Sequence, residues 1–163
     1  MMSGCMTVFG VMKSAAQVSN GVVKLAQGFK VAVDGKPIEA ETGHAAPFMI
    51  DFDGDGRKDL VMGEFKEGRA RVYLNVGTDK NPQFKDFSYL QAGGKDASVP
   101  PACCIGFDPS FMDLNGDGIM DVTSGQYMGG FINFYEGTGE KPFQFKAGVN
   151  LLQPELEKEA AKD

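Results

Sequence analysis

Two short segments of the chain concentrate aspartates and glycines in one pattern. Residues 51–59 read DFDGDGRKD, and residues 113–121 read DLNGDGIMD. Each segment has an oxygen-bearing side chain at positions 1, 3, 5 and 9 and a glycine at positions 4 and 6. Carboxylates crowded in this way repel one another unless a cation lies between them. The chemistry that these two segments predict is therefore the binding of a cation by oxygen ligands.

The residue types in the two segments indicate which cation they would bind. Glycine at positions 4 and 6 permits positive φ angles, so a tight coil can turn the carboxylates toward one point. A large set of hard oxygen ligands suits Ca²⁺ and fits the stricter octahedron of Mg²⁺ less well, whereas zinc prefers histidine or cysteine. We predict two Ca²⁺ sites, with the backbone carbonyls of Arg57 and Ile119 at position 7 as further ligands. The alternative is a pair of Asp/Gly-rich turns without metal.

Neither loop is of the EF-hand type. An EF-hand loop ends in a bidentate glutamate at position 12, whereas position 12 is Met62 in the first loop and Ser124 in the second. The residues that follow each loop are strand formers and do not form an amphipathic helical pattern. Asp59 and Asp121 at position 9 supply the closing carboxylate instead.

The two loops belong to an internal repeat, which appears when the sequence is shifted along itself so that Asp51 meets Asp113. Between positions 47 and 73, nine residues are identical to the residue 62 positions later, among them the pairs Gly63 with Gly125 and Tyr73 with Tyr135. A repeat of this length predicts supersecondary units that stack on one another.

Each repeat reads as short strands joined by turns, so the fold class that we predict is all-β. Residues 71–76 alternate polar and apolar side chains with a period of two, which is typical of a strand. Residues 29–39 read as a hairpin with a turn at Asp34-Gly35. Residues 91–101 are rich in Gly, Pro and Ser and read as a long loop. The other expected strands cover residues 48–50, 60–63, 83–89, 111–112, 122–125, 131–136 and 143–146.

The composition excludes several classes of function. The 163 residues carry 16 basic and 22 acidic side chains, a net charge of −6, so no nucleic acid is expected as a partner. No apolar run approaches the length of a membrane-spanning helix, so we expect no transmembrane segment. Cys5, Cys103 and Cys104 do not make a disulfide framework, and we expect the last two to be buried thiols. Residues 2–5 resemble the end of a bacterial lipoprotein cleavage box, but the apolar stretch that should precede it is missing.

The sequences DFDGDGRKDL and DLNGDGIMDV resemble the calcium loops of FG-GAP repeats, also called VCBS repeats, which form blades of integrin-α-like β-propellers. Residues 43–47 (GHAAP) and 75–78 (NVGT) resemble the same repeat type, and the resemblance covers about residues 43–150. By position, it implies two Ca²⁺ sites. The implied ligands of the first are Asp51, Asp53, Asp55, the carbonyl of Arg57 and Asp59, and those of the second are Asp113, Asn115, Asp117, the carbonyl of Ile119 and Asp121.

The resemblance also implies an architecture. We expect a leader or disordered segment over 1–20, a β-hairpin and lead-in strand over 21–43, a first antiparallel blade over 44–104, a second over 105–152, and a solvated tail over 153–163. A propeller closes with about 4–8 blades, and two blades leave sheet edges and apolar faces open. We therefore expect the two blades to be part of a larger propeller or to self-associate.

The function that follows is a non-enzymatic binding or scaffold module of an extracytoplasmic bacterial protein, with residues 91–101 as an exposed loop for a protein or glycan partner. The alternative is the propeller portion of a secreted carbohydrate-active enzyme. Weaker candidates are a nucleophile–base pair of His44 with Cys103 or Cys104 and an acid pair drawn from Glu64, Glu67 and Glu136. We expect Phe65 and Tyr127 to pack within the blades.

Overall fold

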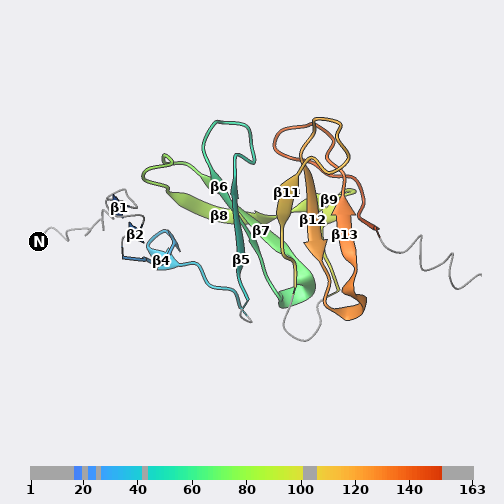
Figure 1. Cartoon of the computed structure of the whole chain (residues 1–163), viewed down its shortest axis with the longest axis horizontal. Helices are drawn as coiled ribbons and strands as arrows, with labels where there is room; N and C mark the ends of the chain where they lie inside the picture. The colour runs from blue at the N-terminus through green and yellow to red at the C-terminus, as the bar shows by residue number, and fades with distance from the viewer. Residues whose placement is uncertain (1–16, 20–21, 25–26, 42–43, 101–105, 152–163) are drawn as a thin grey trace, which may run out of the picture.

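The computed structural model describes residues 17–19, 22–24, 27–41, 44–100 and 106–151. Two larger sheets stand side by side in it (Figure 1), and both are antiparallel except where β3 meets β8. The first has six strands in the order β4-β3-β8-β7-β6-β5, and the second has four in the order β11-β12-β13-β14. Two short 3-10 turns, η1 (Lys66–Gly68) and η2 (Met128–Gly130), are the helical elements of the described ranges. The prediction of an all-β fold is confirmed.

The strands are short, as the spacing of the turns predicts. The first sheet consists of β3 (Ala32–Val33), β4 (Lys36–Pro37), β5 (Ala46–Ile50), β6 (Asp59–Gly63), β7 (Ala70–Asn75) and β8 (Phe84–Tyr89). The second consists of β11 (Ser110–Met112), β12 (Asp121–Gly125), β13 (Ile132–Tyr135) and β14 (Val149–Asn150). Two separate hairpins are β1 (Gln17–Ser19) with β2 (Val22–Lys24) and β9 (Gln91–Ala92) with β10 (Lys95–Asp96).

The repeat in the sequence corresponds to a pattern of strand pairing that occurs twice in the structure. We call β5–β8 blade 1 and β11–β14 blade 2, since each is a four-stranded antiparallel meander. Leu60 lies opposite Tyr73 in blade 1, and their repeat equivalents Val122 and Tyr135 lie opposite each other in blade 2. Both acidic loops therefore lie at the same end of the molecule, and η1 and η2 lie at the other (Figure 1). One end of the fold gathers all the predicted ligands.

Alternation along the strands gives each blade two faces. Residues directly opposite on neighbouring strands lie on the same face of a sheet. We define face A by the paired rows Met49–Leu60–Tyr73 in blade 1 and Phe111–Val122–Tyr135 in blade 2. Face B is defined by the rows Phe48–Val61–Val72 in blade 1 and Ser110–Thr123–Phe134 in blade 2. The two rows of each kind occupy the same positions of the repeat.

The blades pack head to tail, with face B of blade 1 against face A of blade 2. Val61 and Val72 share one buried core with Val122, and the rings of Phe48 and Phe111 lie 5.2 Å apart between centroids. This core is where most of the buried apolar side chains of the described residues are gathered, and its burial is the main stabilising contribution to the pair.

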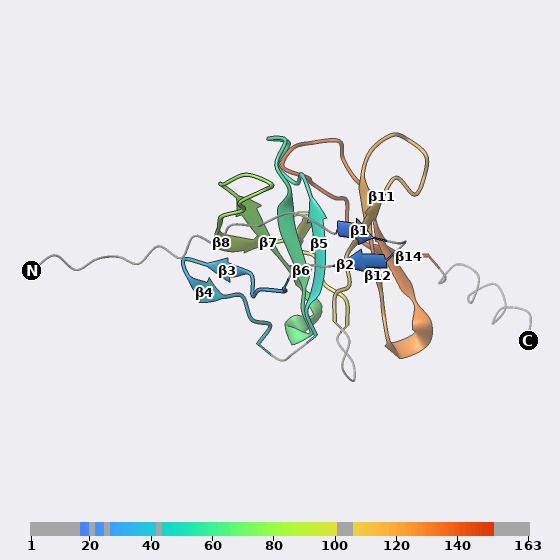
Figure 2. The same ribbon diagram turned by 60° about the vertical axis from the view of Figure 1, so that its left-hand side comes forward.

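Different partners remain for the two outer faces. Residues 27–41 cover part of face A of blade 1, where Val33 and Ile38 pack on a second core around Leu60 and Tyr73, while Met49 of the same row stays 45% exposed. Figure 2 shows the β3–β4 hairpin beside this sheet, away from blade 2. The predicted hairpin is confirmed there, with Asp34 and Gly35 at positive φ. Face B of blade 2, in contrast, leaves Ile132 and Val149 exposed.

Two expectations about the connections are wrong. The described part of the expected loop 91–101, residues 91–100, is not a long exposed loop, because a Gly93-Gly94 turn joins β9 to β10 and Ala97 and Val99 are buried in the core between the blades. The last strand of blade 2 is not residues 143–146. Phe143 and Phe145 instead fill the inter-blade core, and the strand that pairs with β13 is β14.

Several expectations lie outside the described residues: those on Cys5, on Cys103 and Cys104, and on the segments 1–16 and 153–163. Within the ranges that are described, the chain has no helix of the length and apolar character that a membrane span requires.

Candidate metal centre

Position 1 of each loop organises the glycine coil. The two oxygens of the Asp51 carboxylate accept the N–H groups of Gly54 and Gly56, at 2.8 and 3.1 Å. In the second loop the glycine N–H groups at positions 4 and 6 donate in the same way to Asp113, at 2.7 and 2.9 Å. All four glycines have φ between +78° and +86°, a conformation that L side chains rarely adopt. The coil predicted from the glycines is thus present twice.

Positions 3 and 5 continue the same scheme. Asp53 accepts the N–H of Asp55 at 3.1 Å, and Asp55 accepts that of Arg57 at 2.8 Å. In the second loop, bonds of 3.0 and 2.8 Å join the same positions, with Asn115 in place of Asp53. Each bond uses one oxygen lone pair, and a carboxylate offers about four, so oxygens remain for a cation.

Position 9 ties each loop to its blade. Asp59 is fully buried, and its two oxygens accept the N–H groups of Phe52 and Asn75 at 2.8 and 2.7 Å. Asp121 is equally buried and accepts the corresponding pair at 3.0 and 2.8 Å. Burial raises the pKa of the Asp59 carboxyl, and the two N–H donors oppose that rise. These aspartates fix where the loop ends and where the next turn begins.

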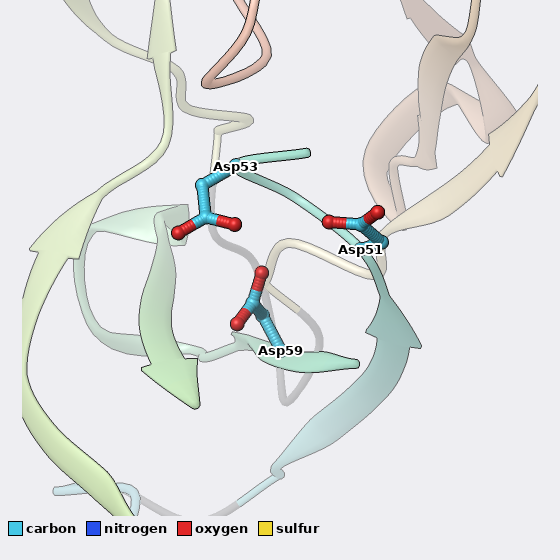
Figure 3. Close-up of side chains that lie close together, drawn as sticks. All are labelled: Asp51, Asp53 and Asp59. Atoms are coloured by element: carbon cyan, nitrogen blue, oxygen red, sulfur yellow. The ribbon is translucent and has the colours of Figure 1, made fainter. Parts of the chain in front are cut away.

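The first loop brings three carboxylates together. Oxygens of Asp51, Asp53 and Asp59 all lie within 4.8 Å of one another, and Figure 3 shows the three side chains converging on one region above β6. Among the described residues, this is the group of three acidic side chains with such close oxygens. The donors are all oxygens, so the set fits a hard divalent cation such as Ca²⁺.

The remaining predicted ligands are placed less uniformly. Asp55 lies in the loop, but its carboxylate forms an ion pair with the guanidinium of Arg57, and Arg57 also donates from Nε to the carbonyl of Asn75 at 2.7 Å. In the second loop Asn115 donates from its amide to Asp117 at 3.0 Å. The two loops therefore share a backbone scheme and differ in charge, with four aspartates in the first and three in the second.

The structure adds residues that the sequence analysis did not identify. The side chain of Asn75 accepts the N–H groups of Gly77 and Gln83 and donates to the carbonyl of Lys58 at 3.2 Å. Asp79 accepts the N–H of Lys58 at 2.8 Å. In the sequence, the NVGT motif at residues 75–78 could have identified Asn75 as a residue that supports the loop. No sequence motif identifies Asp79, because its contact with Lys58 depends on how the β7–β8 turn folds back on the loop.

Blade 2 also reaches the first loop. Lys141 donates from Nζ to the carbonyl of Asp51 at 2.8 Å, and its ammonium lies 3.3 Å from the centroid of the Phe143 ring. The backbone N–H of Phe143 donates to the carbonyl of Phe52 at 3.0 Å. The first loop is therefore held at the junction of the two blades.

The three glutamates that were candidates for an acid pair each lie beside a different basic side chain. Glu64, Glu67 and Glu136 form ion pairs with Arg71, Arg69 and Lys146 respectively. His44 is exposed. Phe65 is half-buried, but Tyr127 is 55% exposed, so the expectation that Tyr127 packs within its blade is wrong.

One comparison with known proteins identifies the repeat. Residues 51–124 match the family model of the FG-GAP-like repeat, a span that contains both acidic loops. No curated protein and no solved structure was found to match the chain. The resemblance seen in the two loops and the blade-like pairing of their strands agree with that match. Residues 51–124 of this chain therefore match an FG-GAP-like repeat, over a stretch that runs from blade 1 into blade 2, and the four-stranded antiparallel pairing of both sheets is consistent with blades of the β-propeller type.

Proposed function

We propose that this protein is a calcium-binding repeat module with two sites, one in each acidic loop. The observation that supports the proposal most strongly is the duplicated loop geometry, in which backbone N–H groups hold the side chains at positions 1, 3, 5 and 9. Such loops are preorganised, so less conformational entropy is lost when a cation binds. The cation would supply charge neutralisation to the clustered aspartates and a brace at the blade junction.

The same proposal assigns the ligands. In the first site Asp51, Asp53 and Asp59 would hold the ion, with Asp55 and the carbonyl of Arg57 completing the set. In the second site the ligands would be Asp113, Asn115, Asp117, the carbonyl of Ile119 and Asp121. Oxygen ligands of this number suit Ca²⁺ better than Mg²⁺, which keeps several of its waters.

We further propose a non-catalytic role as a binding or scaffold module outside the cytoplasm, with a protein or glycan partner. Extracellular modules bind Ca²⁺ with dissociation constants of about 10⁻⁴–10⁻³ M, and partly solvated loops such as these suit that range. The three glutamates that could have formed an acid pair are instead each neutralised by a basic side chain, which supports a non-enzymatic role.

Thermal unfolding with and without calcium tests the proposal. One site that binds only the folded state adds about 2.7 kcal/mol when the free ion is at 100 times its dissociation constant. We expect EGTA to lower the Tm, added Ca²⁺ to restore it, and Mg²⁺ at the same concentration not to. Titration calorimetry should count two sites. Equal melting curves in Ca²⁺ and EGTA, together with no calorimetric binding at millimolar Ca²⁺, would remove calcium from the assignment.

A further inference from the structure

Lys141 of blade 2 places an ammonium group against the first acidic loop, which belongs to blade 1. Its Nζ donates to the backbone carbonyl of Asp51 at 2.8 Å and lies 3.3 Å from the centroid of the Phe143 ring. The stem of the side chain lies against the glycine coil, since a Cβ on Gly54 would be 3.1 Å from Cγ of Lys141. These contacts fix a positive charge beside position 1 of the loop.

No ion pair neutralises this charge. The ion pairs of the part of the chain that the structure describes do not include Lys141. A carbonyl oxygen and the face of an aromatic ring carry only partial negative charge, so the ammonium keeps its positive charge. A cation bound by Asp51 would be repelled by it. Lys141 is exposed, so salt reduces this repulsion.

The second loop lacks this arrangement. Gly116 is the repeat equivalent of Gly54, and a Cβ on Gly116 would meet nothing within 4 Å. Positions 7 and 8 of the second loop are Ile119 and Met120, whereas the first loop has an arginine and a lysine there. Basic side chains are therefore built into and around the first loop alone.

The formal charges reverse the order that the number of aspartates suggests. Residues 51–59 hold four aspartates and two basic residues, a formal charge of −2, and Lys141 brings the total to −1. Residues 113–121 hold three aspartates and no basic residue, a formal charge of −3. Calcium affinity follows the charge of the site, so the second loop offers a cation the more negative surroundings.

We propose that Lys141 sets the calcium affinity of the first site: its ammonium weakens the binding of Ca²⁺ there, so that the second site fills before the first. This rests on the proposed function, in which both loops are calcium sites. Because Lys141 and Asp51 belong to different blades, the first site is also linked to the blade junction. By reciprocity, a bound cation weakens the Lys141 contact by the factor by which Lys141 weakens the cation.

Titration calorimetry of the full chain with Ca²⁺ in low salt tests the proposal. Lys141→Met keeps an apolar stem on Gly54 and removes the charge. Each protein also carries Asp117→Ala, which disables the second site, so that the heats report the first. We expect Lys141→Met to strengthen Ca²⁺ binding about three- to tenfold and Lys141→Arg to leave it within about twofold of the parent. The gain should shrink in 1 M NaCl, where the Debye length is about 3 Å.

The matched control is Lys66→Met, which changes the net charge equally. Lys66 lies in η1, at the end of the molecule opposite the acidic loops (Figure 1), so its loss should leave the affinity unchanged. In the chain with both loops intact, the tighter of the two sites should not respond to Lys141→Met. If Lys141→Met lowers the Tm in EGTA strongly, Lys141→Gln repeats the measurement.

The sign of the effect separates charge from packing. If Lys141 acted only as a structural contact between the blades, Lys141→Met would weaken Ca²⁺ binding. That result, an unchanged affinity, or an equal gain from Lys66→Met would overturn the role of Lys141 while leaving calcium in both loops. If neither the parent nor any variant binds Ca²⁺ at millimolar concentration, the proposed function itself fails, and the role of Lys141 with it.

Discussion

Position 3 of the acidic loops distinguishes the two proposed sites at the scale of a single residue. Asp53 and Asn115 make the same hydrogen bond to the N–H at position 5. They differ in one negative charge and in the amide N–H of Asn115, which donates to Asp117. An Asn at this position is therefore compatible with the loop backbone, and we expect the charge of the carboxylate to act on the proposed binding of a cation.

This comparison predicts a reciprocal exchange of affinity. Asp53→Asn should weaken Ca²⁺ at the first site by about tenfold, since calcium affinity follows the number of charged ligands, and should leave stability in EGTA nearly unchanged. Asn115→Asp should strengthen the second site by a similar factor. Titration calorimetry and thermal unfolding of the two variants measure both effects. If Asp53→Asn unfolds the metal-free protein, position 3 has a structural role that the shared hydrogen bond does not explain.

A buried tyrosine predicts the alkaline limit of stability. Burial raises the pKa of Tyr135 to about 12 from its ordinary value of 10.0, and its hydroxyl donates to the carbonyl of Ser98 at 2.8 Å. The folded state therefore holds this proton more tightly than the unfolded chain does. The resulting stability is complete below pH 10 and is lost as the pH rises from about 10 toward 12, by roughly 2–3 kcal/mol.

Tyr135→Phe should remove that pH dependence. It should lower stability near pH 7 by about 1 kcal/mol, the typical contribution of one hydrogen bond. Urea unfolding at several values between pH 7 and pH 11.5 measures both changes. Tyr127→Phe is the control, because Tyr127 is mostly exposed; if the two variants have the same alkaline profile, another group causes the loss.

At the scale of the strand, the two blades carry different kinds of side chain at one pair of equivalent positions. Glu64, which follows β6, and Arg71 of β7 form an ion pair of 2.7 Å, with side chains that are 1% and 8% exposed. Their repeat equivalents in blade 2 are Gln126 and Asn133, whose amides are 3.4 Å apart. A buried charge pair in blade 1 thus corresponds to a neutral polar pair in blade 2.

Blade 2 therefore supplies a substitution that blade 1 should tolerate. Arg71→Asn alone should cost about 3–5 kcal/mol, because it leaves the Glu64 carboxylate buried without a counter-charge. The double variant Glu64→Gln with Arg71→Asn should recover at least half of that loss. Denaturant unfolding of the two single variants and the double variant gives the coupling free energy. Additive losses would mean that the ion pair is not what connects the two positions.

The elements show which parts of the fold local sequence could predict. The loops, β6 and β12 follow from signals contained within a few residues: the DxDGDG pattern and the apolar run after it. The hairpin of β9 and β10 also has a local signal, Gly93-Gly94, but the surrounding Gly, Pro and Ser suggested a loop. No local sequence signal predicts the burial of Ala97 and Val99, because their burial depends on a core shared by both blades.

Non-local contacts explain the other differences. The sequence suggested strand 143–146, but Phe143 and Phe145 are drawn into the inter-blade core, and pairing with β13 passes to Val149 and Asn150. Within the site, the side chains of Asp51, Asp53 and Asp59 converge, as the spacing of these aspartates in the sequence predicts. The contact of Lys141 with the first loop could not be predicted, since the two lie in different repeats and far apart in the sequence.

For the whole molecule, stacking is directional: each blade presents face B forward and face A backward. Directional contacts do not close on themselves between two units, in contrast to a twofold interface. One face of each kind is therefore left over after the two blades have packed. Among the described residues, 27–41 cover part of the leftover face A, and Ile132 and Val149 on face B of blade 2 are exposed.

The direction of stacking predicts opposite outcomes for two glycines that occupy the same repeat position. Gly63→Ala should destabilise the protein by about 3 kcal/mol or prevent folding, since the new methyl group would meet the backbone of Phe107 and the blades would have to separate. Gly125→Ala should change stability by less than about 1 kcal/mol, because its position is open. Equal losses in urea unfolding would show that the glycines serve the strand itself and that the asymmetry of the two blades is not what requires Gly63.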